Sequence, residues 1–168
     1  DQVQSYNSHH ENKKRLSVKL RLGNDDFTDE SFYNFCDMLV DEGVELLTLH
    51  PRTKKEKLTR PPRYEYCQKI AERYKNQKVK VYLNGKVSDW NSFNDALVKA
   101  PDVDGVMIST AAVQKPWIFA QLKQLALEPV NMEELSLQYI EDIEQFQPPE
   151  FWKTRLQRFF TYISKNFK

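Results

Sequence analysis

Short apolar stretches alternate with amphipathic stretches four times along the chain, and this alternation limits the possible folds more than any other feature. Strands are predicted at 16–21, 44–49, 79–83 and 106–108, with helices at 28–42, 63–75 and 116–126 and a helix that begins at Ser88 and carries Trp90, Phe93 and Leu97. Strands that alternate with helices indicate a parallel sheet. The predicted fold class is therefore α/β, with four βα units. These units make either one half of a (β/α)8 TIM barrel or a small open doubly wound sheet.

Local signals support these boundaries. Thr28 is a suitable N-cap, and Asp29 and Glu30 follow it in the first helical turn, where the helix dipole favours anions. Gly43 is suited to the residue that ends this helix. One apolar helical face is predicted from Phe32, Phe35, Cys36 and Leu39. Beyond residue 126 the strands stop, and two helices are predicted at 132–145 and 150–166.

Composition narrows the function classes. The formal net charge is +1, so any affinity for nucleic acid must come from local clusters. Cys36 and Cys67 form neither a metal-ligand signature nor a disulfide framework, and we interpret them as reduced, packed thiols, which favours a cytoplasmic location. The absence of a long apolar run predicts no membrane span and no signal peptide. Residues 1–14 are predicted to be a flexible lead-in.

Polar residues stand at the carboxyl ends of the predicted strands, which is where ligands bind in both candidate folds. A histidine on a strand is more often a core residue, and Lys19 could be exposed at a sheet edge. The presence of such polar residues at successive strand ends nevertheless predicts one pocket. This pocket would bind a flat, anionic cofactor such as a flavin, with the phosphate of the cofactor near the last two strands. The residues are Lys19, Arg21, His50, Arg52, Asn84, Gly85, Lys86, Ser109 and Thr110.

A basic loop follows the second strand. Residues 52–63 contain six cations and a single acid, Glu56. Such a run is often a solvated loop, but its position beside the predicted pocket favours contacts with RNA phosphates, which are salt-dependent and independent of sequence. The predicted RNA-binding residues are Arg21, Arg52, Lys54, Lys55, Lys57 and Arg60, with Arg155 and Arg158 on the last helix.

Four motifs in order resemble the tRNA-dihydrouridine synthase family. They are Ser-Val-Lys-Leu-Arg-Leu-Gly at 17–23, Leu-Thr-Leu-His-Pro-Arg-Thr at 47–53, Asn-Gly at 84–85, and Asp-Gly-Val-Met-Ile at 104–108 with Ala-Ala-Val-Gln-Lys-Pro-Trp-Ile-Phe at 111–119. The resemblance implies that residues 15–127 are the second half of an FMN-binding barrel. It also implies that residues 128–168 begin a C-terminal helical tRNA-binding domain.

The resemblance further implies an enzyme that reduces uridine to dihydrouridine in tRNA, with FMN as cofactor and NADPH or NADH as reductant. Lys19 and His50 then resemble flavin contacts. Asn84, Gly85 and Lys86 resemble one side of the phosphate site, and Ser109-Thr110 the other. The family's general-acid cysteine belongs to the first half of the barrel, which is absent here. The chain alone is therefore expected to be inactive, with no catalytic residue of its own.

One departure from the family pattern supports an alternative. The family usually has Gly-Arg where this chain has Ser109-Thr110, and the loss of a cation there weakens a phosphate site. The alternative is a non-catalytic RNA-binding relative with a degraded flavin phosphate site. A third possibility, an FMN barrel for a small molecule, fits the basic loop and tail less well. In a half barrel both sheet edges are open, so the missing N-terminal half or a second copy is expected to cover them.

Overall fold

The computed structural model of the protein describes residues 2–11, 14–24, 28–57, 59–126 and 128–167. Two compact units are present. One comprises Asp1–Val87 and Asn91–Ile108, and the other comprises Ser88–Trp90 and Ser109–Lys168. The units are described separately below.

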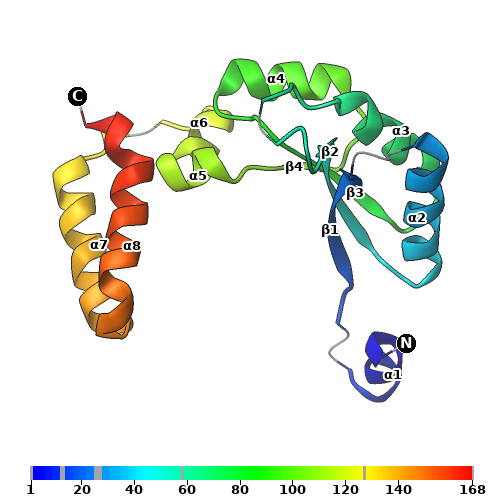
Figure 1. Ribbon diagram of the computed structural model, residues 1–168, viewed down its shortest axis with the longest axis horizontal. Coiled ribbons are helices and arrows are strands. Elements are labelled where there is room, and N and C mark those ends of the chain that lie inside the picture. The colour runs from blue at the N-terminus through cyan, green and yellow to red at the C-terminus, as the bar shows by residue number, and fades with distance from the viewer. Residues whose placement is uncertain (1, 12–13, 25–27, 58, 127, 168) are drawn as a thin grey trace. The chain divides into compact units, whose positions relative to one another are not determined.

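The first unit is built on a four-stranded sheet (Figure 1). Its strands are β1 (Ser17–Gly23), β2 (Leu46–Thr53), β3 (Lys80–Asn84) and β4 (Gly105–Met107). The strand order is β1-β2-β3-β4, and each neighbouring pair is parallel. The prediction of a parallel α/β sheet built from successive βα units is thereby confirmed.

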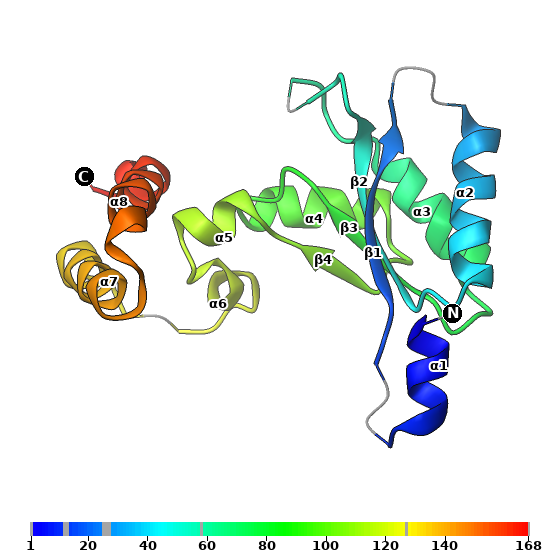
Figure 2. The same ribbon diagram turned by 60° about the horizontal axis from the view of Figure 1, so that its bottom comes forward.

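The helices of this unit are α1 (Gln2–His9), α2 (Asp29–Asp41), α3 (Tyr64–Tyr74) and, from Asn91 on, α4 (Trp90–Lys99). Figures 1 and 2 show α2, α3 and α4 along one side of the sheet. The Thr28 side chain caps α2 by accepting a hydrogen bond from the backbone N–H of Ser31, and Gly43 has a φ of 87°, both as predicted. Helix α1 was not predicted from the sequence.

The core lies between the sheet and these helices. Its strand residues are Leu20, Leu22, Leu47, Leu49, Val81 and Leu83. On α2, Phe32 and Cys36 are buried, but Phe35 is 47% exposed, so the predicted four-residue apolar face is wrong at Phe35. Cys36 and Cys67 are free thiols in this core, and burial raises the pKa of each to about 12.

Strand β2 is longer than predicted because it continues through His50, Pro51 and Arg52 to Thr53. The pairing of β1 with β2 shifts register between Arg21 and Gly23, which leaves an irregularity beside Pro51. Proline lacks a backbone N–H and is accepted in sheets mainly at such bulges. The predicted end at residue 49 was therefore too early, and Pro51 does not turn the chain out of the strand.

The second unit is helical. It contains α5 (Thr110–Gln114), α6 (Ile118–Leu122), α7 (Met132–Phe146), α8 (Pro149–Ile163) and the short 3-10 helix η1 (Ser164–Asn166). Two short helices replace the single one predicted at 116–126, whereas α7 and α8 confirm the last two predicted helices. Tyr139 of α7 stacks on Phe159 of α8 with ring centroids 3.8 Å apart. Within the described residues, no helix is long and apolar enough to cross a membrane.

Candidate functional site

The carboxyl ends of the four strands bring several of the predicted site residues into one row. Arg21 pairs with His50, and Asn84 pairs with Met107. Successive side chains of a strand point to opposite faces, so these residues lie on the face opposite the apolar core. We call this surface the His50 face. Two residues earlier along the strands, the same face carries Lys19, Thr48 and Tyr82. Thr48 pairs with Lys19 on one side and with Tyr82 on the other.

His50 and Arg52 form the buried centre of this face. His50 is 6% exposed and Arg52 is 1% exposed, and Arg52 Nη1 lies 3.0 Å from His50 Nε2. A guanidinium can only donate, so Nε2 accepts and the imidazole is neutral with its proton on Nδ1. Burial, together with the nearby cations Arg21, Arg52 and Lys19, lowers the pKa of His50 to about 4.

Gly85 closes one side of the His50 ring. Its φ is +126°, and a Cβ at this position would lie 2.9 Å from His50 Cδ2. The hydroxyl of Tyr64, the first residue of α3, donates a hydrogen bond to the Gly85 carbonyl. Asn84 Nδ2 donates to the Met107 carbonyl at 2.7 Å and so joins β3 to β4. The predicted Asn-Gly turn therefore packs directly against the predicted histidine.

The other predicted cofactor residues are placed differently. Lys19 and Lys86 are exposed, and Lys86 has a φ of 54°. Ser109 and Thr110 are exposed and belong to the second unit, at the start of α5. His50 and Gly85 are thus brought into contact, whereas the roles of Lys19, Lys86, Ser109 and Thr110 remain predictions.

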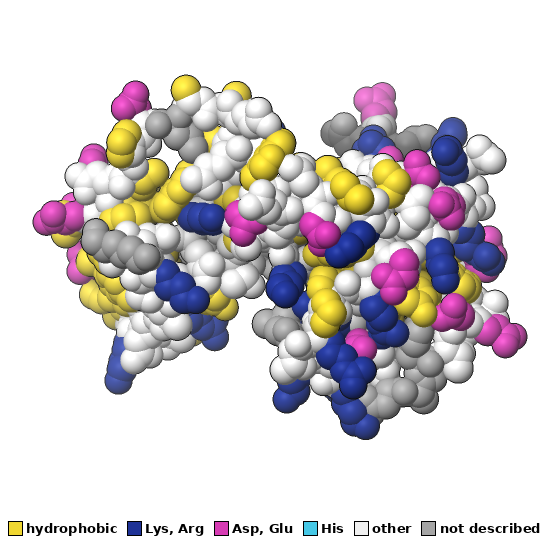
Figure 3. All heavy atoms as spheres, turned by 90° about the horizontal axis from the view of Figure 1, so that it is seen from above, with side chains coloured by type: hydrophobic (Ala, Val, Ile, Leu, Met, Phe, Trp, Pro, Cys, Tyr) yellow, Lys and Arg dark blue, Asp and Glu magenta, His cyan; other side chains and the backbone are white. Residues whose placement is uncertain are grey.

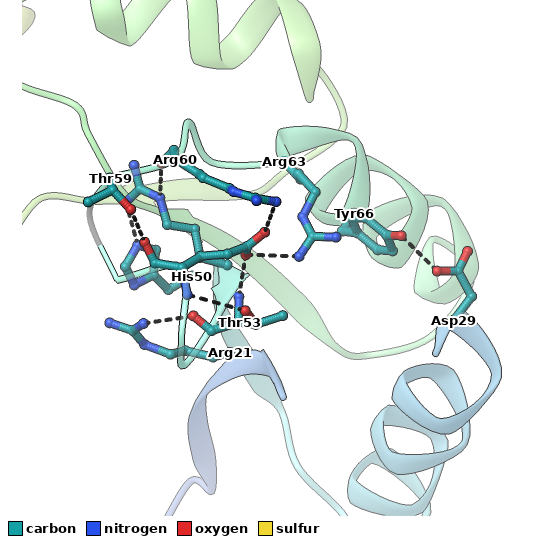
Figure 4. A network of polar contacts seen from close by, with 10 residues as sticks. Arg21, Asp29, His50, Thr53, Thr59, Arg60, Arg63 and Tyr66 are labelled. Carbon is teal, nitrogen blue, oxygen red and sulfur yellow. Dashed lines mark hydrogen bonds and ion pairs between the residues drawn. The ribbon is translucent and has the colours of Figure 1, made fainter. Parts of the chain in front are cut away.

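The basic loop after β2 is organised around Glu56, whose partners Thr53, Arg60 and Arg63 are labelled in Figure 4. Its Oε2 accepts from the backbone N–H of Thr53 at 2.7 Å and from Arg63 Nη2 at 2.9 Å. Arg60 Nη1 lies 3.9 Å from the other carboxylate oxygen. Although burial opposes it, these hydrogen bonds and charges lower the pKa of Glu56. The sequence analysis assigned no role to Glu56. Its position as the single acid among six cations was the signal that it pairs with them.

The cations of the loop fall into two groups. Lys54, Lys55, Lys57 and Arg60 are exposed, as RNA-contacting residues must be. Arg52 is buried instead, and its Nε donates to the Arg60 carbonyl at 2.6 Å. Burial places Arg52 in the wall of the site and not on the exposed rim, where the sequence interpretation had put it.

Charge elsewhere on the surface is mixed. On the face shown in Figure 3, Lys and Arg side chains lie among Asp and Glu side chains. Arg155 and Arg158 are exposed on α8 of the second unit. A nucleic acid would therefore have to meet local basic clusters, in keeping with the net charge of +1.

A pocket of the first unit lies at the opposite edge of the sheet. It has a volume of about 720 Å³ and is lined by residues at the amino ends of the strands, among them Ser17, Leu46 and Lys80. Ligands of parallel α/β sheets bind at the carboxyl ends. We therefore assign the candidate site to the His50 face and not to this pocket.

Comparison with known proteins identifies the family of the chain. The family model described as Dihydrouridine synthase (Dus) matches residues 6–149. The chain belongs to the dihydrouridine synthase family. The match includes all four strands, the His50 face, the basic loop and the whole of α7.

Three curated relatives of the chain are named as tRNA-dihydrouridine synthases or as similar to them. The chain is 33% identical over 112 residues to the tRNA-dihydrouridine(47) synthase [NAD(P)(+)]-like protein of Xenopus laevis. This match covers 65% of the chain and 16% of the relative. The chain is 29% identical over 109 residues to a probable tRNA-dihydrouridine synthase of Aquifex aeolicus, covering 65% and 32%. A 26% identical match to the tRNA-dihydrouridine(47) synthase [NAD(P)(+)] of Schizosaccharomyces pombe covers 82% and 24%. The chain thus spans a third or less of each of these relatives.

Proposed function

We propose that this chain is part of a flavin-dependent tRNA-dihydrouridine synthase and supplies the second half of its (β/α)8 barrel. Residues 15–127 would form this half, and residues 128–168 would begin a helical tRNA-binding domain. Family membership and the names of the relatives support the proposal. The observation that carries it is a neutral histidine held between Arg52 and Gly85 at the carboxyl edge of the sheet.

The residues present suit a flat, anionic cofactor. Gly85 lets the backbone pack directly against the His50 ring, where any side chain would clash, and the Nδ1–H of His50 is a hydrogen-bond donor. Lys19 and Arg21 add positive charge on the same face. We propose that Lys19 and His50 hold the ring of FMN, and that its phosphate is bound by Asn84, Gly85, Lys86, Ser109 and Thr110. When bound, FMN would transfer hydride from NADPH or NADH to the uracil ring.

The chain does not contain a suitable proton donor of its own among its cysteines. Cys36 and Cys67 are buried, and burial raises the pKa of each to about 12. A thiol in such surroundings is inert. The general acid would therefore come from the missing half of the barrel, and the chain alone would be inactive. A cytoplasmic location belongs to the same proposal.

A test of the cofactor site is the affinity for FMN, measured by quenching of flavin fluorescence in the protein that carries both barrel halves. Replacing Lys19 or His50 by Ala should weaken binding about 10-fold or more, because each removes a hydrogen bond to the cofactor. Lys80, which is exposed at the amino end of β3, provides the control, and K80A should bind as the unchanged protein does. If K19A and H50A bind FMN as tightly as the unchanged protein does, the assignment is refuted.

We further propose that Lys54, Lys55, Lys57 and Arg60 bind tRNA phosphates, with Arg21 beside them and Arg155 and Arg158 on α8. Their exposure supports this role. Phosphate contacts release counterions, so the logarithm of the affinity should fall linearly with the logarithm of the salt concentration. The triple variant K54A/K55A/K57A should flatten this slope by about 2 to 3, at roughly 0.7 to 0.9 per lost contact.

The control for the tRNA experiment is K75A/K78A/K80A, which removes the same charge from the amino edge of the sheet. If both triple variants change the salt slope equally, the basic loop is not the binding surface.

Ser109 and Thr110 favour one alternative, a non-catalytic RNA-binding relative. Hydroxyl groups in place of a cation weaken a phosphate site. A protein with both barrel halves that retains tRNA binding but shows no flavin absorption would establish this alternative.

A further inference from the structure

Arg52 is among the largest fully buried side chains of the described residues, and its side chain makes two hydrogen bonds to different partners. One runs from Nη1 to His50 Nε2 at 3.0 Å, and the other runs from Nε to the carbonyl of Arg60 at 2.6 Å. Burial of a guanidinium is costly unless its donors are satisfied. Both bonds are therefore expected to persist in the folded protein.

The first bond determines which ring nitrogen of His50 carries the proton. Arginine has no acceptor, so a bond between Arg52 and Nε2 requires the lone pair of that nitrogen. The Cδ2–Nε2 edge of the same ring faces Gly85, whose Cβ would lie 2.9 Å and 3.1 Å from these two atoms. Nδ1 lies across the ring from that edge. The donor of the imidazole is thus directed away from Gly85 and Arg52.

The second bond fixes the far end of the basic loop. The Arg60 carbonyl is held by Arg52, and the backbone N–H of Arg63 donates to the Pro51 carbonyl at 3.0 Å. Glu56 adds bonds to Thr53 at the beginning of the loop and to Arg63 at its end. The loop that carries the exposed cations is therefore bonded to Pro51, Arg52 and Thr53, the residues of β2 that directly follow His50.

We infer that Arg52 is a positioning residue that fixes His50 as its Nδ1–H tautomer and anchors the Arg60 end of the basic loop beside it. In functional terms, which rest on the proposed function, Arg52 presents a hydrogen-bond donor to the cofactor and sets where the RNA-binding loop stands. Arg52 itself need not touch either ligand.

The tautomer can be read without any cofactor. Long-range 1H–15N correlation spectra of the 168-residue chain at pH 7.5 distinguish a protonated from an unprotonated ring nitrogen, and an H50Q variant assigns the His50 signals. The expected result is one neutral species with the proton on Nδ1. A proton on Nε2 in the unchanged chain would overturn the inference, whatever any variant shows.

Two substitutions separate the two bonds. In R52M both are lost, so we expect both tautomers of His50 and amide exchange at Arg63 about 10-fold faster or more. In R52K a single ammonium can still donate to Nε2 but cannot also replace the fork that reaches Arg60. We therefore expect R52K to keep the Nδ1–H tautomer while the Arg63 amide exchanges faster.

The matched control is R21M. Arg21 is also a cation beside His50, but its Nη1 donates to the Thr53 carbonyl at 3.3 Å and not to the ring. R21M should leave the tautomer unchanged. Retention of the Nδ1–H tautomer in a folded R52M chain, or its loss in R21M, would overturn the inference. Should R52M not fold, the unchanged chain and R52K still decide the question.

Failure of this inference is distinguishable from failure of the proposed function. A chain with the expected tautomer, whose complete protein does not bind FMN, retains the positioning role and loses the proposed function. Binding of FMN by the complete protein, with the proton of His50 on Nε2 in the isolated chain, gives the reverse result.

Discussion

Gly85 tolerates no larger residue without disturbing His50. Its φ of +126° is unfavourable for residues with a Cβ, and that Cβ would also press on the imidazole at 2.9 Å. Replacement by Ala should lower the free energy of unfolding by about 1 to 3 kcal/mol, measured by urea titration, and should shift the ring resonances of His50. Gly43, with a φ of 87° after α2, is the matched control. G43A should also be destabilised, but the His50 resonances should remain in place.

His50 makes stability depend on pH. The ordinary pKa is 6.5 and the folded pKa is about 4, so between these values the unfolded chain binds a proton that the folded chain does not. The free energy of unfolding should therefore fall as the pH is lowered from 6.5 to 4, by about 3 kcal/mol at most. In urea titrations across this range H50Q should lose this dependence, whereas H9Q/H10Q should keep it. An unchanged slope in H50Q would contradict the prediction.

Glu56 should control the order of the basic loop as an element. Replacing it by Gln keeps the shape of the side chain but removes the negative charge that pairs with Arg63 and strengthens the hydrogen bond from the Thr53 N–H. We expect the Thr53 amide to exchange about 5-fold faster or more, corresponding to the loss of roughly 1 kcal/mol. Glu65 is exposed in the first turn of α3, and E65Q serves as the control. Equal exchange rates at Thr53 in E56Q and E65Q would show that Glu56 does not hold the loop.

Local patterns predicted the elements better than they predicted the site. The Thr28 cap, the Gly43 terminus and the strand alternation are short-range signals, and each was confirmed. Strand β2 was predicted too short because Pro51 normally ends a strand, and only the pairing with β1 shows the bulge that accepts it. Because the strand was predicted to end before Pro51, Arg52 was assigned to the loop and grouped with its exposed cations. Its burial follows from the return of the loop to β2, a tertiary contact without a sequence pattern.

At the scale of the whole molecule, the His50 face and the edges of the sheet should make the isolated chain associate. Strands β1 and β4 each have one neighbour in the sheet, and Met107 on β4 is 36% exposed. Sedimentation velocity should show mass increasing with concentration, and M107K should weaken the association about 10-fold, because it places a charge in the contact. Val98 is 79% exposed on α4, so V98K provides the control. A monomer at all concentrations would favour a complete open sheet over a half barrel.

Because the strand order repeats the chain order, every ladder of the sheet joins two consecutive segments of the polypeptide. Among the strands that the structure describes, none is inserted between two that precede it in the chain. A growing chain can therefore complete each ladder as soon as the next strand is made, and earlier ladders never have to open. Contacts of this kind lower the sequence separation that folding must bridge. The same arrangement makes the sheet divisible, since a cut between two successive βα units removes one ladder and leaves the others whole.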